Sequence, residues 1–237
     1  MQKVLSLVRK AVQEYDMIAD GDKIAVGVSG GKDSMLTLTA LNELRRFYPV
    51  KYDVVAVLID LRFDGTDTDC TGIQTYCDSI GVPFHIKRTD IGQIVFDVRK
   101  EENPCSLCAK MRRGALHDFA KELGCNKIAL GHHADDAAET FMMNVFIEGR
   151  IGCYSPVTYL SRKDITVIRP LSWMREWEVA SAVKRLGIPV MKNKCPHDHE
   201  GQRKQMKSFL TELAKTRFPQ AQERILGAMR RGHICGW

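Results

Sequence analysis

The sequence lacks any apolar run long enough to cross a membrane, and it contains no repeat or low-complexity segment. Four charged residues interrupt the apolar positions of residues 1–15: Lys3, Arg9, Lys10 and Glu14. We therefore expect an amphipathic helix there rather than an export signal. These absences exclude membrane-spanning and repeat architectures, and we expect a soluble, cytoplasmic protein with no membrane partner.

Without an export signal, the eight cysteines of the 237-residue chain are expected to stay reduced. Cysteines in a reducing compartment more often bind metal or take part in chemistry than form disulfides. The hydrophobic content of 44% and the charged content of 27% are typical of a globular protein. The length allows one large domain, or a domain with a small appendage.

The net charge of +6 is unevenly distributed along the chain. Residues 1–150 contain 19 Lys and Arg against 22 Asp and Glu, a balance of −3. Residues 151–237 contain 16 against 7, a balance of +9. Scattered lysines often only solvate a helical face, but here basic residues recur over several segments. We therefore favour contact between the C-terminal third and a nucleic-acid backbone.

A glycine turn at residues 29–34 follows the apolar run 24–28 and precedes a helical pattern. Two common phosphate loops are excluded, because Val26 stands where a Walker loop has its first glycine and Ser29 where the dinucleotide motif has its second. A glycine turn between a strand and a helix still exposes N–H groups at the positive end of the helix dipole. With the charge of Lys32, the turn predicts an anion site.

Apolar strand patterns alternate with helical patterns along the chain, which predicts a doubly wound α/β fold with a parallel sheet of five strands and additional C-terminal helices. The predicted strands are 24–28, 53–60, 84–87, 127–130 and 166–168. The predicted helices after the first are 35–44, 67–79, 91–99, 106–123, 134–146, 173–186, 202–216 and 220–229. We divide the chain into an N-terminal helix (1–22), a nucleotide-binding domain (23–190) and a basic helical segment packed on that domain (191–237).

A second polar motif, Gly131 to Thr140, begins where the fourth predicted strand ends. Its adjacent carboxylates Asp135 and Asp136 have two candidate roles: holding Mg²⁺ near a triphosphate, or serving as a general base. Helix capping explains one of them but not the whole group. Because the carboxyl ends of parallel strands share one edge of the sheet, we expect this motif to lie near the glycine turn.

A C-x-x-C pair, Cys105 and Cys108, follows Pro104 at the start of a predicted helix, and Cys195 is a distant third candidate ligand. Two metal sites remain open. A structural zinc site would add His197 or His199 as the fourth ligand, whereas an iron–sulfur cluster needs only the three thiolates. We expect the remaining cysteines to be core or filler: Cys70, Cys77, Cys125, Cys153 and Cys235.

The hexapeptide SGGKDS resembles the PP-loop of ATP pyrophosphatases, which cleave ATP between the α and β phosphates. Read together with GHHADDAAET and CSLCAKMRRG, it resembles the tRNA 2-thiocytidine synthetase family, nearly end to end. This resemblance implies an adenine nucleotide alpha hydrolase-like fold. The ATP-binding residues that it implies are Ser29, Gly30, Gly31, Lys32, Asp33, Ser34, Gly131 and Asp136.

The resemblance also implies a [4Fe–4S] cluster on Cys105, Cys108 and Cys195, and Mg²⁺ with the ATP. Lys32, Asp136 and Arg112 are the implied catalytic residues. Arg112 falls where related thiouridine synthetases have a catalytic lysine; because arginine stays protonated, we expect it to neutralise phosphate or a developing oxyanion. One departure is that Lys192 occupies a position where the family often has another cysteine.

The function implied is an ATP-dependent tRNA sulfurtransferase that adenylates the C2 carbonyl of a base, preferably cytidine, and replaces its oxygen by sulfur from the cluster. The implied partners are tRNA, a cysteine desulfurase or sulfide as sulfur source, and a second copy of the chain in a homodimer. Alternatives are a 2-thiouridine-forming thiolase, a PP-loop tRNA ligase with structural zinc, and a non-catalytic iron–sulfur protein that binds ATP.

Overall fold

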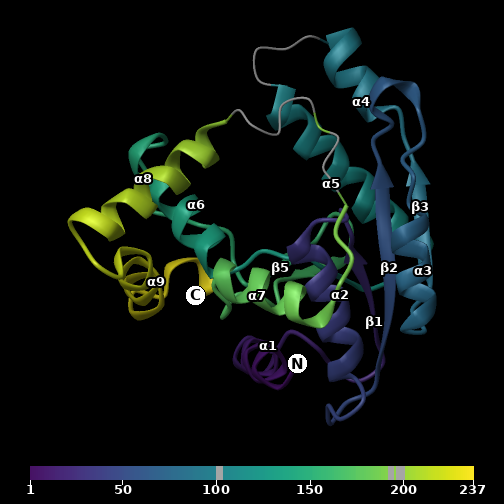
Figure 1. Ribbon diagram of the computed structural model, residues 1–237, viewed down its shortest axis with the longest axis horizontal. Coiled ribbons are helices and arrows are strands. Elements are labelled where there is room, and N and C mark those ends of the chain that lie inside the picture. Colours follow the sequence, from purple (N-terminus) through teal and green to yellow (C-terminus); the bar gives the residue numbers. More distant parts are fainter. Residues whose placement is uncertain (100–103, 192–194, 196–200) are drawn as a thin grey trace.

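The computed structural model describes residues 1–99, 104–191, 195 and 201–237. A six-stranded sheet in the order β3-β2-β1-β4-β6-β5 forms its centre (Figure 1). The strands are β1 (Asp22–Gly27), β2 (Tyr52–Asp60), β3 (Phe84–Arg88), β4 (Lys127–Ala129), β5 (Val157–Leu160) and β6 (Ile165–Ile168). Among the helices in the described part of the chain, none combines the length and the apolar composition needed to cross a membrane.

The predicted doubly wound α/β fold is confirmed, but the expected number of five strands is wrong. Five strands run parallel, and β5 adds a sixth, antiparallel to β6, at the edge of the sheet. This strand has only four residues, and its Tyr159 is exposed. Such a short, partly polar edge strand leaves no apolar run in the sequence that could predict it.

Alternate residues of the central strands contribute to two separate cores, one on each face of the sheet. Val26 and Ala56 belong to the larger core, which α1 (Gln2–Glu14), α2 (Lys32–Leu44), α3 (Thr71–Ser79) and α7 (Glu176–Leu186) complete. Ala25 and Val57 belong to the core on the opposite face, where α5 (Pro104–Glu122) packs. Because both faces are covered, the strands are buried and their apolar runs are nearly continuous.

A third group of helices lies to one side of the sheet: α6 (Ala134–Phe146), α8 (Gln202–Thr216) and α9 (Ala221–Arg231) (Figure 1). α6 and α9 share a small core, to which α6 contributes Ala137 and α9 contributes Met229. Trp237 also packs there and donates from Nε1 to the Tyr154 carbonyl at 2.7 Å. This packing places the C-terminal helices beside the second motif.

Several helix bounds differ from the predicted ones. α3 begins at Thr71 rather than at residue 67, because residues 67–70 remain irregular after a short 3-10 turn at Phe63–Gly65. The helix expected over 91–99 is a single turn, α4 (Ile91–Gln93), that continues as a π-helix (Ile94–Arg99). A second short 3-10 turn, Ile234–Gly236, follows α9.

Candidate nucleotide and metal site

The glycine turn joins β1 to the first turn of α2. Gly30 has a φ of +78°, in the left-handed region that favours glycine, and a Cβ there would lie 2.9 Å from the Cβ of Met191. The Ser34 hydroxyl closes the turn: it accepts from the Ser29 N–H at 3.1 Å and donates to the Gly31 carbonyl at 2.9 Å. No described side chain caps α2, so its first N–H groups remain available to an anion.

Gly131 brings the second motif against this turn. A Cβ at Gly131 would lie 2.7 Å from the carbonyl carbon of Asp33 and 2.9 Å from the backbone nitrogen of Ser34. Only a glycine allows the segment after β4 to approach the start of α2 so closely. The expectation that the two motifs lie side by side is therefore confirmed.

The two adjacent aspartates of the second motif have different environments. Asp135 is buried and pairs with Arg175, whose Nη2 lies 2.6 Å from Asp135 Oδ1. Asp136 forms a capping box at the start of α6, where its Oδ2 accepts from the His133 N–H at 3.0 Å. Asp135 therefore links α6 to the start of α7, whereas Asp136 caps α6 and lines an adjacent groove.

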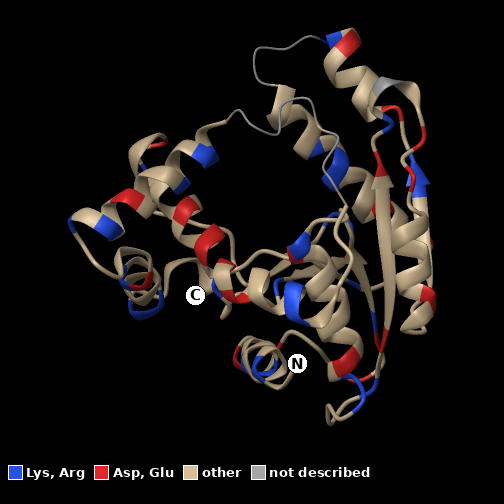
Figure 2. Ribbon diagram, viewed as in Figure 1, with Lys and Arg blue, Asp and Glu red and all other residues tan. Residues whose placement is uncertain are grey.

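A groove of about 960 Å³ lies between the glycine turn, the first turns of α6 and α7, and one face of α8. Acidic residues line it along α6, and basic residues line it along α8 (Figure 2). Asp33 Oδ1 is buried and has no hydrogen-bond partner among the described residues. The charged residues that line the groove are Lys32, Asp33, Asp136, Glu139, Glu176, Arg203, Lys204, Lys207, Glu212 and Lys215.

Glu139 is a buried carboxyl in this groove, one helical turn after Asp136. Its pKa is raised to about 7: burial is the main cause, the nearby charge of Asp136 adds to the rise, and Arg203 opposes it. Arg203 Nη1 lies 3.5 Å from Glu139 Oε2. A carboxyl with a pKa near neutrality can exchange a proton at physiological pH.

The C-x-x-C cysteines lie in the first turns of α5, in the electrostatic neighbourhood of Cys195. Burial raises the pKa of Cys108, the charge of Arg112 lowers it, and the charges of Cys195 and Cys105 raise it. Among the described residues, no three His, Cys, Asp or Glu side chains converge closely enough to hold a metal ion as they stand. Three thiols in one neighbourhood nevertheless form the donor set that an iron–sulfur cluster takes. His197 and His199, the alternative zinc ligands, lie outside the described residues.

The remaining cysteines divide into two groups. Cys70, Cys77 and Cys125 are buried, as expected of core residues. Cys235 is exposed, so of the two expectations, core or filler, core is excluded for it; its Sγ accepts from the Cys153 N–H at 3.3 Å. None of the eight cysteines, all within the described residues, is in a disulfide.

His132 is next to His133, which lines the groove. The pKa of His132 is lowered to about 3, mainly by burial and also by the positive charges of Arg169, Arg203 and Arg112. His132 also contacts the ring of Tyr154, with 5.0 Å between the ring centroids. A pKa of about 3 means that His132 is neutral at physiological pH.

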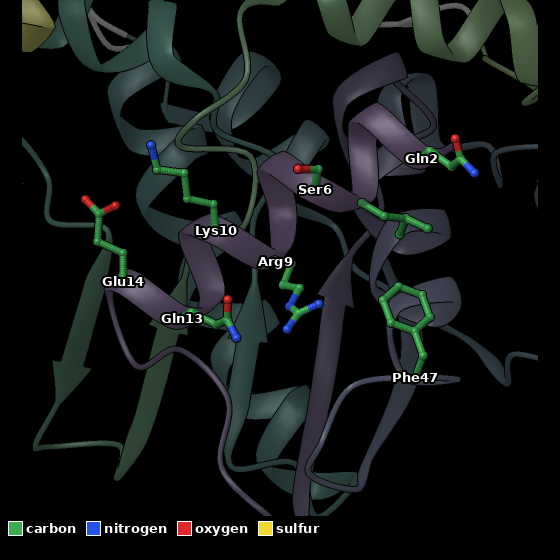
Figure 3. A pocket seen from close by; sticks show the side chains of 8 residues that line it. Gln2, Ser6, Arg9, Lys10, Gln13, Glu14 and Phe47 are labelled. Atoms are coloured by element: carbon green, nitrogen blue, oxygen red, sulfur yellow. The ribbon is translucent and has the colours of Figure 1, made fainter.

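Sequence reasoning missed Glu139, Glu176 and the groove-lining face of α8. Glu139 is part of the second motif, so its position one turn after Asp136 was the available signal. Glu176 and α8 reach the groove only through tertiary packing. A second hollow, of about 790 Å³, lies along the outer face of α1 beside Phe47 (Figure 3). It contains no residue of either motif, and we assign no role to it.

The fold and the glycine turn define a PP-loop nucleotide-binding protein, and the PP-loop domain family matches residues 2–214. A tRNA-cytidine(32) 2-sulfurtransferase from Pelobacter propionicus is 40% identical over 229 residues, which are 95% of this chain and 84% of that one. The corresponding protein of Geobacter sulfurreducens is 41% identical over 217 residues, covering 90% of this chain and 84% of its own. The chain belongs to this family of tRNA sulfurtransferases.

A solved structure is similar over most of the chain. The U34-tRNA thiolase NcsA from Methanococcus maripaludis, determined with its [4Fe–4S] cluster, has a TM-score of 0.78 and 27% sequence identity. The match covers 95% of this chain and 77% of that one. The two proteins therefore have the same fold over almost the whole of this chain.

Proposed function

We propose that this protein adenylates the C2 carbonyl oxygen of a cytidine in tRNA and replaces that oxygen by sulfur. Two observations carry the proposal: the close contact of the second motif with the glycine turn, and the charge interaction of Cys108 with both Cys105 and Cys195. The names of the relatives support cytidine as the target. Residues 191–237 act within the same unit as residues 23–190, because α8 lines the groove.

Activation comes first, because an amide-like carbonyl resists direct substitution. The base C2 oxygen attacks the α-phosphate of ATP, so an O–P bond forms while the bond to pyrophosphate breaks. Lys32 and the open N–H groups at the start of α2 stabilise the phosphate charge. Asp33, with its unpartnered Oδ1, and Asp136 offer hard oxygen ligands that fit a Mg²⁺ ion accompanying ATP.

Substitution follows at the same carbon. Sulfide adds to C2, the C2–O bond breaks, and AMP leaves with the former base oxygen. Because sulfur enters as sulfide, the step needs no net oxidant or reductant. Arg112, which keeps its charge, stabilises the developing negative charge, and Asp136 is close enough to the groove to accept a proton.

Cys105, Cys108 and Cys195 would hold the [4Fe–4S] cluster. When bound, the cluster supplies an iron site that keeps sulfide available away from bulk water. Burial raises the pKa of Cys108, and the positive charge of Arg112 opposes that rise. The sulfur source, a cysteine desulfurase or free sulfide, and a homodimer are further parts of this proposal.

The test measures metal content and ATP binding separately. Anaerobically purified protein should contain iron and acid-labile sulfide, and Cys195→Ala should lose both while retaining ATP binding. Lys32→Ala should keep the iron and lose ATP affinity. Cys235→Ser, at an exposed cysteine outside the trio, is the matched control and should behave as wild type. Zinc without sulfide would refute the sulfurtransferase chemistry and favour a PP-loop ligase.

A second candidate target is uridine, which the likeness to a U34-tRNA thiolase supports. The same site chemistry would then produce 2-thiouridine. Nucleoside analysis of tRNA after reaction distinguishes the two, since 2-thiocytidine and 2-thiouridine differ in mass.

A further inference from the structure

One face of α8 runs along the nucleotide groove. Its groove-lining residues recur at helical spacing: Arg203, Lys204, Lys207, Ser208, Thr211, Glu212, Lys215 and Thr216. Met206 and Leu210 of the same helix are buried. The basic helix that we expected to contact a nucleic-acid backbone therefore also forms a wall of the nucleotide groove.

Two lysines from different elements meet at one carboxylate oxygen in this groove. The Nζ of Lys32, in the glycine turn, lies 3.2 Å from Oε1 of Glu176. The Nζ of Lys207, on α8, lies 2.6 Å from the same oxygen. All three side chains line the groove and remain partly exposed. Two ammonium groups are thus held at one point of an accessible site.

Arg203 fixes the approach of α8. It lies one helical turn before Lys207, on the same face. Its Nη2 donates to Thr140 Oγ1 at 2.9 Å, and its Nη1 lies 3.6 Å from Asp136 Oδ1. Arg203 therefore anchors α8 to α6, next to Lys207, which contacts Glu176 at the start of α7.

The pair of lysines suits a more highly charged anion than a carboxylate. The pyrophosphate part of ATP carries most of the charge of ATP and has several acceptor oxygens, so it competes with Glu176 for both ammonium groups. A single point charge at Lys32 would leave much of that charge uncompensated.

We propose that Lys207 is a second phosphate-binding residue of the nucleotide site, which holds the pyrophosphate part of ATP together with Lys32. Glu176 keeps the two lysines in position before ATP binds. This inference rests on the proposed function, because it takes the glycine turn as the ATP site.

The test is calorimetric titration of ATP and AMP into wild type, Lys207→Ala and Lys184→Ala. Lys207→Ala should weaken ATP binding by roughly 10- to 100-fold, the usual range for losing a hydrogen bond to a charged group. It should weaken AMP binding less than about twofold, because AMP lacks the pyrophosphate. Lys184, exposed on α7, is the matched control, and its removal should change neither affinity.

Unchanged ATP affinity in Lys207→Ala overturns the proposal. Equal losses for ATP and AMP overturn it too, since they indicate a general disturbance of the groove. Lys207→Arg, which keeps the charge, should retain most of the preference for ATP over AMP. The titrations need neither tRNA nor sulfide, so intact ATP binding without thiolation would refute the proposed function and leave this result unchanged.

Discussion

Replacing Gly131 by alanine should separate the two motifs that form the nucleotide site. The added Cβ would lie 2.7 and 2.8 Å from the carbonyl carbon and oxygen of Asp33, and 2.9 Å from the nitrogen of Ser34. All three atoms are backbone atoms, so no side-chain rotation relieves the contact. Either the start of α2 or the end of β4 must move.

Overpacking of this kind costs about 1–3 kcal/mol of the free energy of unfolding. For a chain of this length, each kcal/mol shifts the melting temperature by about 2–4 °C, so we expect a drop of about 2–12 °C. The displaced N–H groups at the start of α2 should also bind ATP more weakly, by at least about tenfold.

Thermal unfolding and ATP titration of Gly131→Ala measure both effects. Gly72→Ala in α3 is the matched control, because a Cβ there meets no atom within 4 Å. The control should be as stable as wild type, or slightly more stable, and should bind ATP normally. Wild-type stability and wild-type ATP affinity in Gly131→Ala would refute the contact between the motifs.

Three further predictions concern the acidic groups. Glu139, with a pKa of about 7, binds its proton more tightly in the folded than in the unfolded protein, so stability should fall by at most about 3 kcal/mol from pH 4.5 to 7. Glu139→Gln should lack this slope in urea unfolding; an unchanged slope would refute the assignment. Asp135→Asn should cost about 3 kcal/mol, because it leaves the largely buried Arg175 short of a partner, and a cost near zero would contradict this. Asp136→Asn should have a free energy of unfolding within about 1 kcal/mol of the wild-type value but should form no AMP. If this variant still forms AMP, Asp136 is not part of the reacting centre.

The central parallel strands β1 and β2 could be predicted because they are buried on both faces and therefore mostly apolar in sequence. The run Val54 to Leu58 is an example, since its residues alternate between two cores but are all apolar. β5 escaped prediction for the opposite reason: as an edge strand, with Tyr159 exposed, it needs no apolar run.

The glycine turn and the second motif could be found from the sequence because their function depends on short-range spacing. The different roles of Asp135 and Asp136 could not. Neighbouring residues on a helix point about 100° apart, and only the position of Arg175, 40 residues away, decides which aspartate is buried.

The contribution of α8 was equally hidden. Its lysines are typical of a basic surface in the sequence, and whether they come close to the glycine turn depends on how α8 packs against α6. The contact of Lys207 with Glu176 joins residues 31 apart in sequence. Likewise, the C-x-x-C spacing predicted one half of a metal site, but only the folded chain brings Cys195 into the neighbourhood of Cys108.

The most direct test of the central claim is mass spectrometry of tRNA nucleosides after reaction of the iron-loaded protein with tRNA, ATP and sulfide. If the nucleotide groove and the cysteines act on the same base, 2-thiocytidine and AMP form in equal amounts, and neither forms when ATP is omitted. AMP released without any thiolated nucleoside, or thiolation that proceeds without ATP, would contradict the account.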